Sequence, residues 1–336
     1  MKKILLFILI ISVRTAMAQQ LPQFTQYVFN NYLLNPAVTG IESYTDLKMG
    51  HRNQWSGLDG APVTSYLSVN TPLGRNFIEG DATGFSAQNG VNPSSRLYTQ
   101  NYQAAEPHHG VGAMILTDKA GPITQTNVAA TYAYHLGLTS RMNLSVGVMG
   151  GFNRITLNTQ DITLTDPNDP AITNGANNSQ WKPDIGAGVW LYSSNYFVGL
   201  SARQLLPQNY YFGTSRTTGS PTVPHFYLTA GIKLFMTDEI TFMPSVLVKR
   251  TSPVPLTYDI NGKFNFNDKF WLGGSYRHKD AAAVLAGFNL SSLINVGYSY
   301  DITTSALNTV SRGTHEIVIG LMLNNGFKLT APQHGF

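Results

Sequence analysis

The amino-acid sequence predicts an all-β fold, a transmembrane outer-membrane β-barrel of about 14 antiparallel strands. Three observations support this prediction. Only 12% of the 336 residues are charged, which is about half the share in a typical soluble domain. Segments of about ten residues alternate between apolar and polar side chains, and the connections between them alternate between short and long. These features exclude a helical membrane bundle and a disordered charged chain.

The first 18 residues have the pattern of a cleaved signal peptide. Lys2 and Lys3 precede an apolar run at 4–11, and Ala16-Met17-Ala18 supplies the small residues of a cleavage site. The apolar run is too short to span a bilayer as a helix. Cleavage would remove three of the 22 basic residues and none of the 18 acidic ones, which lowers the net charge from +4 to +1. We therefore expect export through the inner membrane and no nucleic-acid partner.

The alternation defines the expected strands. In residues 294–301, Ile, Val and Tyr alternate with Asn, Gly, Ser and Asp, so one face of the segment is apolar and the other is polar. A soluble β-sandwich is the alternative, but its exposed face would carry more Lys and Glu. The expected strands are 43–54, 63–72, 110–118, 123–135, 141–152, 184–193, 196–206, 223–235, 239–249, 256–266, 269–277, 282–290, 293–301 and 314–323.

The connections indicate how the barrel is oriented. Bacterial outer-membrane barrels have tight periplasmic turns and longer outer loops. With the N-terminus inside, the short connections fall on the periplasmic side, and the longer ones, 153–183, 207–222, 250–255, 278–281 and 302–313, lie outside. The exception is 73–109, a long insertion on the periplasmic side. The predicted organisation is a signal peptide (1–18), an N-terminal segment (19–42), the barrel (43–323) and a C-terminal tail (324–336).

The N-terminal segment is rich in aromatic and amide side chains. We interpret it as a plug that folds into the barrel, and a periplasmic tail is the alternative. Asn-Pro favours a turn, because proline restricts the residue before it. The plug candidates are Phe24, Gln26, Tyr27, Asn35 and Pro36.

Several short motifs follow one another along nearly the whole mature chain. They lie at 20–30 with Asn35-Pro36-Ala37 and Gly40, at 52–57 with 60–64, and at 117–122, 132–135, 183–188, 196–201, 268–277, 297–301 and 313–317. Taken in this order, they resemble the PorP/SprF family, outer-membrane proteins of the type IX secretion and gliding machinery of Bacteroidota. Segments 75–107 and 153–182 depart from the family pattern, so what they bind does not carry over from the family.

The resemblance implies an accessory barrel, similar to the fatty-acid transporter-like barrels, and not an enzyme. The implied partners are a secreted surface adhesin with a C-terminal sorting domain, which the barrel helps to export or anchor, and periplasmic components of the secretion machinery. The triplet Asn35-Pro36-Ala37 is also similar to the hatch of long-chain fatty-acid transporters. An outer-membrane channel for a hydrophobic solute is therefore the alternative function. The Gly, Ser, Thr and charged residues expected in the lumen count against a hydrophobic ligand.

Partner-binding candidates come from the outer loops and the family motifs. Trp55 offers a large amphipathic contact in the first outer loop, and glycines there allow close approach. The alternative is a structural role, because tryptophan is common at membrane boundaries. The candidates are Trp55, Gly57, Gly60, Asp118, Lys119, Tyr210 and Tyr211.

No local pattern indicates a cofactor, a metal or a catalytic centre. His108 and His109 are adjacent on an extended chain and point apart. Asp161, Asp166 and Asp169 lack the spacing of a helix-flanked calcium loop. A hydrolytic triad could be drawn with His315, Glu316 and Asp301, but no Gly-x-Ser-x-Gly motif supplies the nucleophile. We expect an ion-paired lumen instead, formed by Arg203, Lys233, Lys249, Arg277, Asp301 and Glu316.

Overall fold

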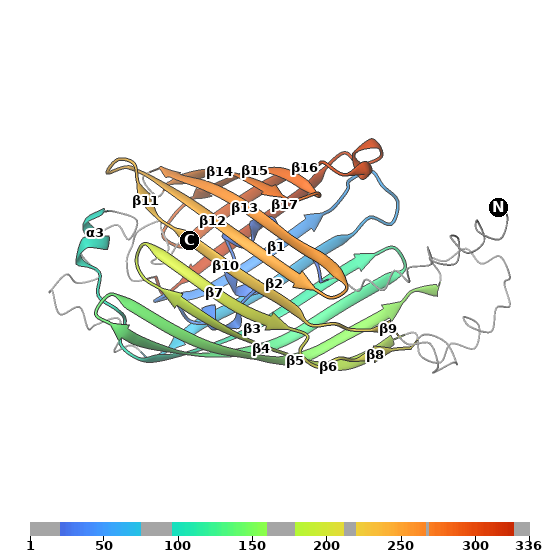
Figure 1. The fold of residues 1–336 in the computed structure, drawn as a ribbon, viewed down its shortest axis with the longest axis horizontal. Coiled ribbons are helices and arrows are strands. Elements are labelled where there is room, and N and C mark those ends of the chain that lie inside the picture. The colour runs from blue at the N-terminus through green and yellow to red at the C-terminus, as the bar shows by residue number, and fades with distance from the viewer. Residues whose placement is uncertain (1–20, 75–95, 160–178, 212–219, 267–268, 326–336) are drawn as a thin grey trace, which may run out of the picture.

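The strands form one closed antiparallel barrel, as the sequence predicts (Figure 1). The computed structural model describes residues 21–74, 96–159, 179–211, 220–266 and 269–325. Each barrel strand pairs with its neighbours in sequence, and β1 closes the barrel by pairing with β17. The strands are β1 (Thr45–Asn53), β2 (Val63–Leu73), β3 (His108–Ala120), β4 (Ile123–Thr139), β5 (Met142–Leu157), β6 (Ser179–Tyr192), β7 (Tyr196–Arg203), β8 (Asn209–Tyr210), β9 (Ser220–Pro221), β10 (His225–Ile232), β11 (Leu234–Phe235), β12 (Ile240–Thr251), β13 (Val254–Phe266), β14 (Phe270–Arg277), β15 (Ala281–Asn289), β16 (Ile294–Thr303) and β17 (Thr314–Leu323).

The predicted strand number is confirmed. β10 and β11 are two parts of one strand, interrupted at Lys233, and both pair with β12. β8 and β9 form a separate two-stranded ribbon outside the barrel sheet. The barrel therefore has 14 strands.

The two ends of the barrel differ. The long-loop end carries the connections 54–62, 204–224 and 304–313, with the β8–β9 ribbon and the 3-10 helix η6 (Ala306–Thr309). The short-turn end carries the tight turns 140–141, 193–195, 236–239 and 290–293, together with α3 (Arg96–Asn101) before β3. Figure 1 shows α3 and the β8–β9 ribbon at opposite ends. Within the described ranges, no helix has the length and apolar character needed to cross a membrane.

Several strands reach further toward the long-loop end than the sequence indicates. β5 continues to Leu157 and β6 begins at Ser179, so residues expected in the loop 153–183 belong to strands. The expected loop 250–255 is reduced to the two residues between Thr251 and Val254. Polar residues such as Asn153 and Lys182 hide these strand ends in the sequence, because strands that extend above the apolar zone no longer need apolar side chains.

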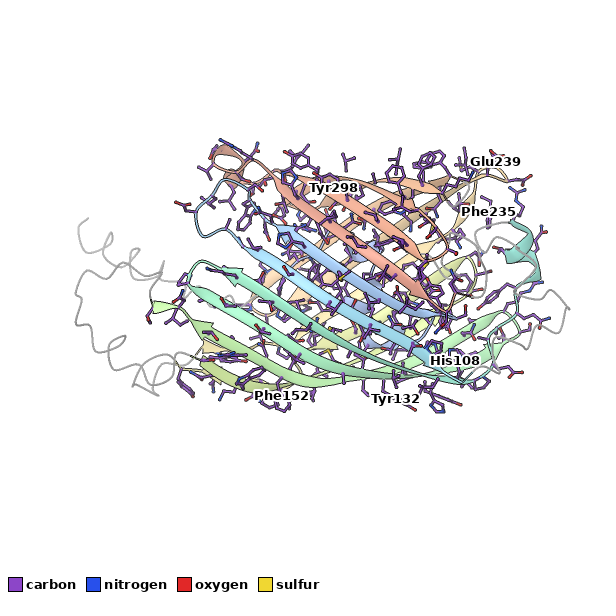
Figure 2. All side chains as sticks on the ribbon, turned by 180° about the vertical axis from the view of Figure 1, so that it is seen from behind. His108, Tyr132, Phe152, Phe235, Glu239 and Tyr298 are labelled. Atoms are coloured by element: carbon purple, nitrogen blue, oxygen red, sulfur yellow. The ribbon has the colours of Figure 1, made fainter. Side chains whose placement is uncertain are left out.

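The alternation predicts which face of each strand is buried. Along β16, Asn295, Gly297, Ser299 and Asp301 are buried, and the intervening apolar residues are exposed or half-buried. Large apolar side chains on the outward face are exposed, including Val148 (52%), Phe152 (57%) and Leu200 (57%). Figure 2 shows Phe152, Tyr132 and Tyr298 on the outside of the barrel. This apolar outer surface suits lipid.

The lumen is filled by the chain that precedes β1. Residues 24–40 form three short 3-10 helices, η1 (Gln26–Val28), η2 (Asn31–Leu33) and η3 (Pro36–Val38), and nearly all of their side chains are buried. Two apolar clusters join this stretch to the barrel wall. Phe24, Tyr27 and Leu33 pack in one cluster with Leu247 and Trp271. The second cluster joins Tyr32, Ala37 and Val38 to Met114, Met149, Trp190 and Phe197.

The outward face of β5 provides a test of the barrel orientation in lipid. Val148 lies near the middle of the strand, and Thr156 lies on the same face near the long-loop end. We predict that Val148→Lys lowers the free energy of unfolding by about 2–4 kcal/mol, because it places a charge at the centre of the bilayer. Thr156→Lys, the matched control, should cost no more than about 1 kcal/mol. Reversible unfolding in lipid vesicles measures both, and equal costs would contradict the assignment of this face to lipid.

Candidate functional site

Besides the two apolar clusters, polar contacts from the barrel wall hold the residues that fill the lumen. We call residues 21–44 the inner segment. Short 3-10 turns leave many backbone carbonyls without a partner, and a buried carbonyl needs one. The inward polar side chains of the barrel provide these partners, so the inner segment and the wall form one site.

One set of wall side chains donates hydrogen bonds to carbonyls of the inner segment. On β7, Arg203 Nη1 donates to Leu33 O (3.0 Å) and Ser201 Oγ donates to Leu34 O (2.7 Å). On β5, Ser145 Oγ donates to Ala37 O (2.7 Å). These bonds explain why serine and arginine occupy inward positions where the sequence alone shows only a polar face.

Two stacked histidines hold the end of the inner segment near the short-turn end. His135 Nε2 lies 2.8 Å from Thr39 O, and His108 Nε2 lies 3.3 Å from Gly40 O. The two rings stack with their centroids 4.5 Å apart. His109, the next residue, faces outward and bonds to Tyr132 Oη at 2.6 Å. The adjacent histidines thus lie on opposite faces of β3, and each inward ring contacts a backbone carbonyl through Nε2.

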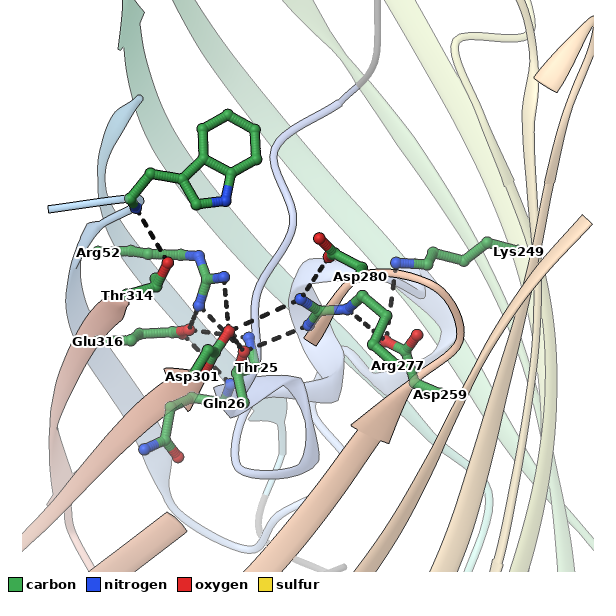
Figure 3. Close-up of polar contacts among 11 residues, drawn as sticks. Thr25, Gln26, Arg52, Lys249, Asp259, Arg277, Asp280, Asp301, Thr314 and Glu316 are labelled. Carbon is green, nitrogen blue, oxygen red and sulfur yellow. Dashed lines mark hydrogen bonds and ion pairs between the residues drawn. The ribbon is translucent and has the colours of Figure 1, made fainter. Parts of the chain in front are cut away.

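At the long-loop end, Thr25 lies within a network of buried ionised side chains (Figure 3). Thr25 Oγ1 donates to Asp301 Oδ2 (2.6 Å), and its backbone N–H donates to Glu316 Oε2 (2.8 Å). Arg52 donates from Nη1 to Glu316 (2.8 Å) and to Thr25 Oγ1 (3.0 Å), and from Nη2 to Asp301 (2.8 Å). A buried arginine and two carboxylates therefore enclose one threonine.

Arg277 on β14 connects this network to Asp259 on β13 and Lys249 on β12 (Figure 3). Its Nη2 donates to Thr25 Oγ1 (3.2 Å), and its Nε donates to Asp259 Oδ2 (3.3 Å). Lys249 Nζ lies 3.7 Å from the same Asp259 oxygen. Between β14 and β16, β15 presents only Ala281 and Ala283 at this level, which leaves room for Arg277 to approach Asp301 (3.7 Å).

The predicted ion-paired lumen is thus present for Lys249, Arg277, Asp301 and Glu316. Arg203 instead binds a backbone carbonyl and Asn127. Sequence reasoning missed Arg52, Asp259 and Thr25. Asp259 alternates with Asn261 and Lys263, a pattern that could have placed it inside, whereas no regular alternation surrounds Arg52.

Glycines of the wall make room for the inner segment. A Cβ on Gly147 would lie 2.5 Å from backbone atoms of Pro36 and Ala37, and a Cβ on Gly188 would lie 1.9 Å from Asn35 Oδ1. Asn35 occupies this space and donates to Val189 O (3.1 Å) and Leu200 O (3.2 Å). Its Oδ1 also accepts from Ala37 N (2.9 Å), which caps η3 just before Pro36.

The remaining plug candidates are also placed against the wall. Phe24 packs edge-on against Tyr66, with the ring centroids 5.4 Å apart. Tyr27 Oη accepts a hydrogen bond from Asn261 Nδ2. Gln26 N donates to Glu316 Oε1 at 3.3 Å, and the Gln26 amide lies beside Gly297. All five candidates are buried.

Three of the partner-binding candidates meet on a small surface at the long-loop end. We define the loop platform as residues 54–62, 121–122 and 311–314. Trp55 N donates to Thr314 Oγ1 (3.0 Å), Ser56 N to Gly313 O (2.8 Å), and Gly121 N to Gly60 O (2.8 Å). These bonds connect loops that are far apart in the sequence, so Trp55, Gly57 and Gly60 lie on a braced surface.

Trp55 has an unusual backbone on this platform. Its φ is +49°, a left-handed conformation that is rare for a bulky residue and costs about 1–3 kcal/mol. Gly57, two residues on, has φ +91°. Such strain persists only where the surroundings hold it, and it is concentrated at functional positions.

The other candidates do not share one surface. Asp118 faces the lumen and accepts from Thr64 Oγ1 (2.5 Å), whereas Lys119 is exposed on the outward face. Tyr210 is only 1% exposed and donates to Asn153 O (3.3 Å), so it packs the β8–β9 ribbon instead of offering a contact. Tyr211 is half-buried and bonds to Gln180.

The candidate triad is not assembled. His315 is exposed on the outward face of β17 and bonds to Tyr298 Oη (2.7 Å), while Glu316 and Asp301 point into the lumen. Asp161, Asp166 and Asp169 lie outside the described residues. Within the described ranges, no group of three or more His, Asp or Glu side chains has the geometry to hold a metal ion.

The closed sheet, its apolar outer face and its occupied lumen define a bacterial outer-membrane β-barrel with an internal N-terminal segment. A family model described as "Type IX secretion system membrane protein PorP/SprF" matches residues 16–321. The chain therefore belongs to the PorP/SprF family.

Several solved structures are similar to this chain in fold at low sequence identity. Omp33 of Acinetobacter baumannii is 7% identical, with a TM-score of 0.46 over 85% of this chain and 100% of its own. The toluene transporter TbuX of Ralstonia pickettii is 11% identical, with a TM-score of 0.47 over 86% and 92%. A FadL homologue of Pseudomonas aeruginosa is 10% identical, with a TM-score of 0.44 over 90% and 94%. These likenesses say nothing about what this chain binds. No curated protein matches the chain.

The glycine contacts predict how the inner segment can be displaced. Gly147→Val would push side-chain atoms into the backbone of η3, whereas Gly150→Val on the same strand meets nothing within 4 Å of its Cβ. The chain has no cysteine, so Val38→Cys provides a single reporter thiol inside the lumen. We predict that a water-soluble maleimide labels this thiol in the Gly147→Val background and not in the Gly150→Val background. Equal protection of the thiol in both backgrounds would show that Gly147 does not determine the position of η3 against the wall.

The ionised network predicts a large cost for removing its central cation. Arg52→Met leaves Asp301 and Glu316 close together without the guanidinium between them. Breaking a buried pair in this way should lower the free energy of unfolding by about 3–5 kcal/mol. Adding Glu316→Gln should recover part of this loss, because one of the two stranded charges is then removed. Denaturant unfolding in vesicles measures both variants, and a loss below about 1 kcal/mol for Arg52→Met would contradict the network.

Proposed function

We propose that this barrel binds a secreted, adhesin-type surface protein with a C-terminal sorting domain and helps to export or anchor it. Membership of a type IX secretion family supports a role in protein secretion. The observation that carries the finer proposal is the loop platform, where hydrogen bonds between separate loops hold Trp55 on a braced surface. With tight turns in the periplasm, the long-loop end faces the cell exterior, where such a substrate arrives.

The loop platform has the properties of a preorganised binding surface. Its backbone is already fixed before binding, so a partner pays little entropy to order it. Trp55 is half-buried, and Leu58, whose N–H donates to Trp55 O, is exposed (36%) on the same loop. Val310 (54%) is exposed in the connection before β17. Tryptophan in a braced, partly buried setting is a common anchor of protein interfaces. Binding on this surface needs no covalent chemistry, which fits a role other than that of an enzyme.

The inner segment favours a barrel that holds a partner over a barrel that conducts a solute. We propose that it acts as a plug, because wall side chains on both halves of the barrel bond to it and its turns are buried. At the short-turn end, we propose that α3 and residues 102–107, which precede β3, meet periplasmic components of the secretion machinery. The partner would then be held outside a closed lumen.

The alternative, a channel for a hydrophobic solute, is less well supported. A cavity of about 80 Å³ lies at the long-loop end of the lumen, lined by Phe24, Tyr27, Tyr227, Leu247 and Lys249, among others. Sites for organic ligands usually measure about 300–1,000 Å³. A hydrophobic solute would have to displace the inner segment, which both polar bonds and two apolar clusters hold to the wall. Uptake of labelled fatty acid by cells that depend on this barrel would revive this alternative.

The position of Trp55 predicts a separation between stability and binding. Trp55→Gly removes the indole but relaxes the positive φ, so the barrel should remain at least as stable. We predict that recovery of the secreted partner with the tagged barrel, from solubilised outer membranes, falls by at least about tenfold, in line with a loss of about 1.4 kcal/mol or more.

The matched control is Leu290→Gly, which removes an exposed apolar side chain (67%) at the short-turn end. Its recovery of the partner should equal that of the wild type. An undiminished recovery with Trp55→Gly would contradict the loop platform as the binding surface. If no secreted protein is recovered even with the wild type, while secretion is intact in a deletion strain, the proposed function itself is wrong.

A further inference from the structure

Acidic and basic side chains are divided between the two faces of the barrel. Every carboxylate on the described strands belongs to the inward face, and these residues are Asp46, Asp118, Asp184, Asp259, Asp301 and Glu316. By contrast, the charged side chains on the outward face of these strands are all Lys or Arg, and the other titratable side chains there are His and Tyr. This division does not follow from the ion-paired lumen, which would work equally well with outward carboxylates.

The permanently charged outward residues share one level of the barrel. Lys119, Arg154 and Arg250 each lie within the last four residues of a strand that runs toward the long-loop end, and each is exposed. Charged side chains near the bilayer centre are costly, but this cost falls toward the interface. Their level therefore corresponds to the headgroup zone at the long-loop end.

Aromatic and histidine side chains lie at the same height, near the long-loop end, at other positions around the barrel. The Arg154 guanidinium lies 5.6 Å from the centre of the Trp181 ring, and Arg154 Nε donates to Ser179 Oγ (2.7 Å). On the other side, His278 stacks on Tyr258 with centroids 4.6 Å apart, and His315 lies 5.0 Å from Tyr300. We call Arg154, Arg250, Lys119, His278 and His315 the basic girdle.

The short-turn end has no matching girdle among the described residues. Exposed charges in the connections are of both signs at either end, so the asymmetry is confined to the strand faces. The connection residues are Glu106, Arg141, Asp238, Glu239 and Lys269 at the short-turn end and Asp59, Lys279 and Arg312 at the long-loop end. On the outward strand face at that end, His109 lies among Tyr132 and Tyr134. The asymmetry separates the two leaflets of the membrane, so a general attraction to phospholipid does not account for it.

We propose that the basic girdle binds the phosphate groups of phosphorylated glycolipids in the outer leaflet. A guanidinium binds phosphate through two parallel N–H···O bonds, and basic clusters at the membrane interface recognise anionic headgroups. Arg154 is preorganised for this contact, since its guanidinium lies against Trp181 and its Nε donates to Ser179, which leaves both Nη groups for phosphate. This binding is independent of the secreted partner and fixes the long-loop end in the outer leaflet.

The test compares two pairs of charge-removing substitutions in the full-length barrel. Arg154→Gln with Arg250→Gln removes two girdle charges, and Arg141→Gln with Lys269→Gln removes two exposed charges at the short-turn end. Each protein is reconstituted in phosphatidylethanolamine vesicles that contain bisphosphorylated lipid A, and native mass spectrometry after detergent extraction measures the lipid A retained per barrel. Heat-modified electrophoretic mobility verifies folding.

We expect the girdle pair to retain at least about tenfold less lipid A than the wild type, with the short-turn pair unchanged. Dephosphorylated lipid A with the same acyl chains should be retained poorly by all three proteins. Equal retention by the girdle pair and the wild type, or equal retention of the dephosphorylated lipid, would overturn the proposal. Should the girdle pair not fold, the single Arg250→Gln decides, since it must lose part of the lipid A while Arg141→Gln alone must lose none. If the girdle pair lost the secreted partner but retained lipid A, the proposal would also be overturned, and the basic girdle would be a protein-binding surface.

Discussion

The structure depends on the burial of the inner segment's backbone inside a barrel that its own wall side chains cannot fill. Small barrels are closed by their interior side chains, but a barrel of 14 strands encloses more space. Here the preceding chain fills that space, and each buried carbonyl that its short turns leave open needs a donor. Arg203, Ser201, Ser145 and His135 supply these donors, and Thr25 is held by the ionised network at the other end.

This constraint accounts for much of the composition. Inward glycines such as Gly147 and Gly188 leave space for the inner segment, and other glycines lie under aromatic rings, as Gly199 lies under Trp190. The low charge content follows from strands that face lipid on one side and a neutral or paired interior on the other. On the described strands, the few charged side chains of the outward face are basic and lie near the long-loop end, whereas the carboxylates all face the lumen.

The sequence predicts the barrel, the strand number and the inward face well, because period-two alternation reports burial directly. It does not predict the strand ends at 153–157 and 179–183, where strands rise above the apolar zone and polar residues resemble a loop. Arg52 escapes detection because its strand lacks clean alternation, and Thr25 because an isolated threonine has no pattern. The loop platform brings together Trp55, Gly57 and Gly60 as neighbours in sequence. Its bond to Gly121 depends on the pairing of β2 with β3, and its bond to Gly313 depends on closure of the barrel between β1 and β17.

Backbone amide exchange tests the central claim most directly. In the barrel reconstituted in lipid, the N–H groups of residues 25–40 that bond within the lumen, including Thr25 and Gly40, should exchange as slowly as those of the neighbouring strands. This result would show that the inner segment is an integral part of the folded barrel. Exchange of these amides within seconds, while the strands remain protected, would contradict the account.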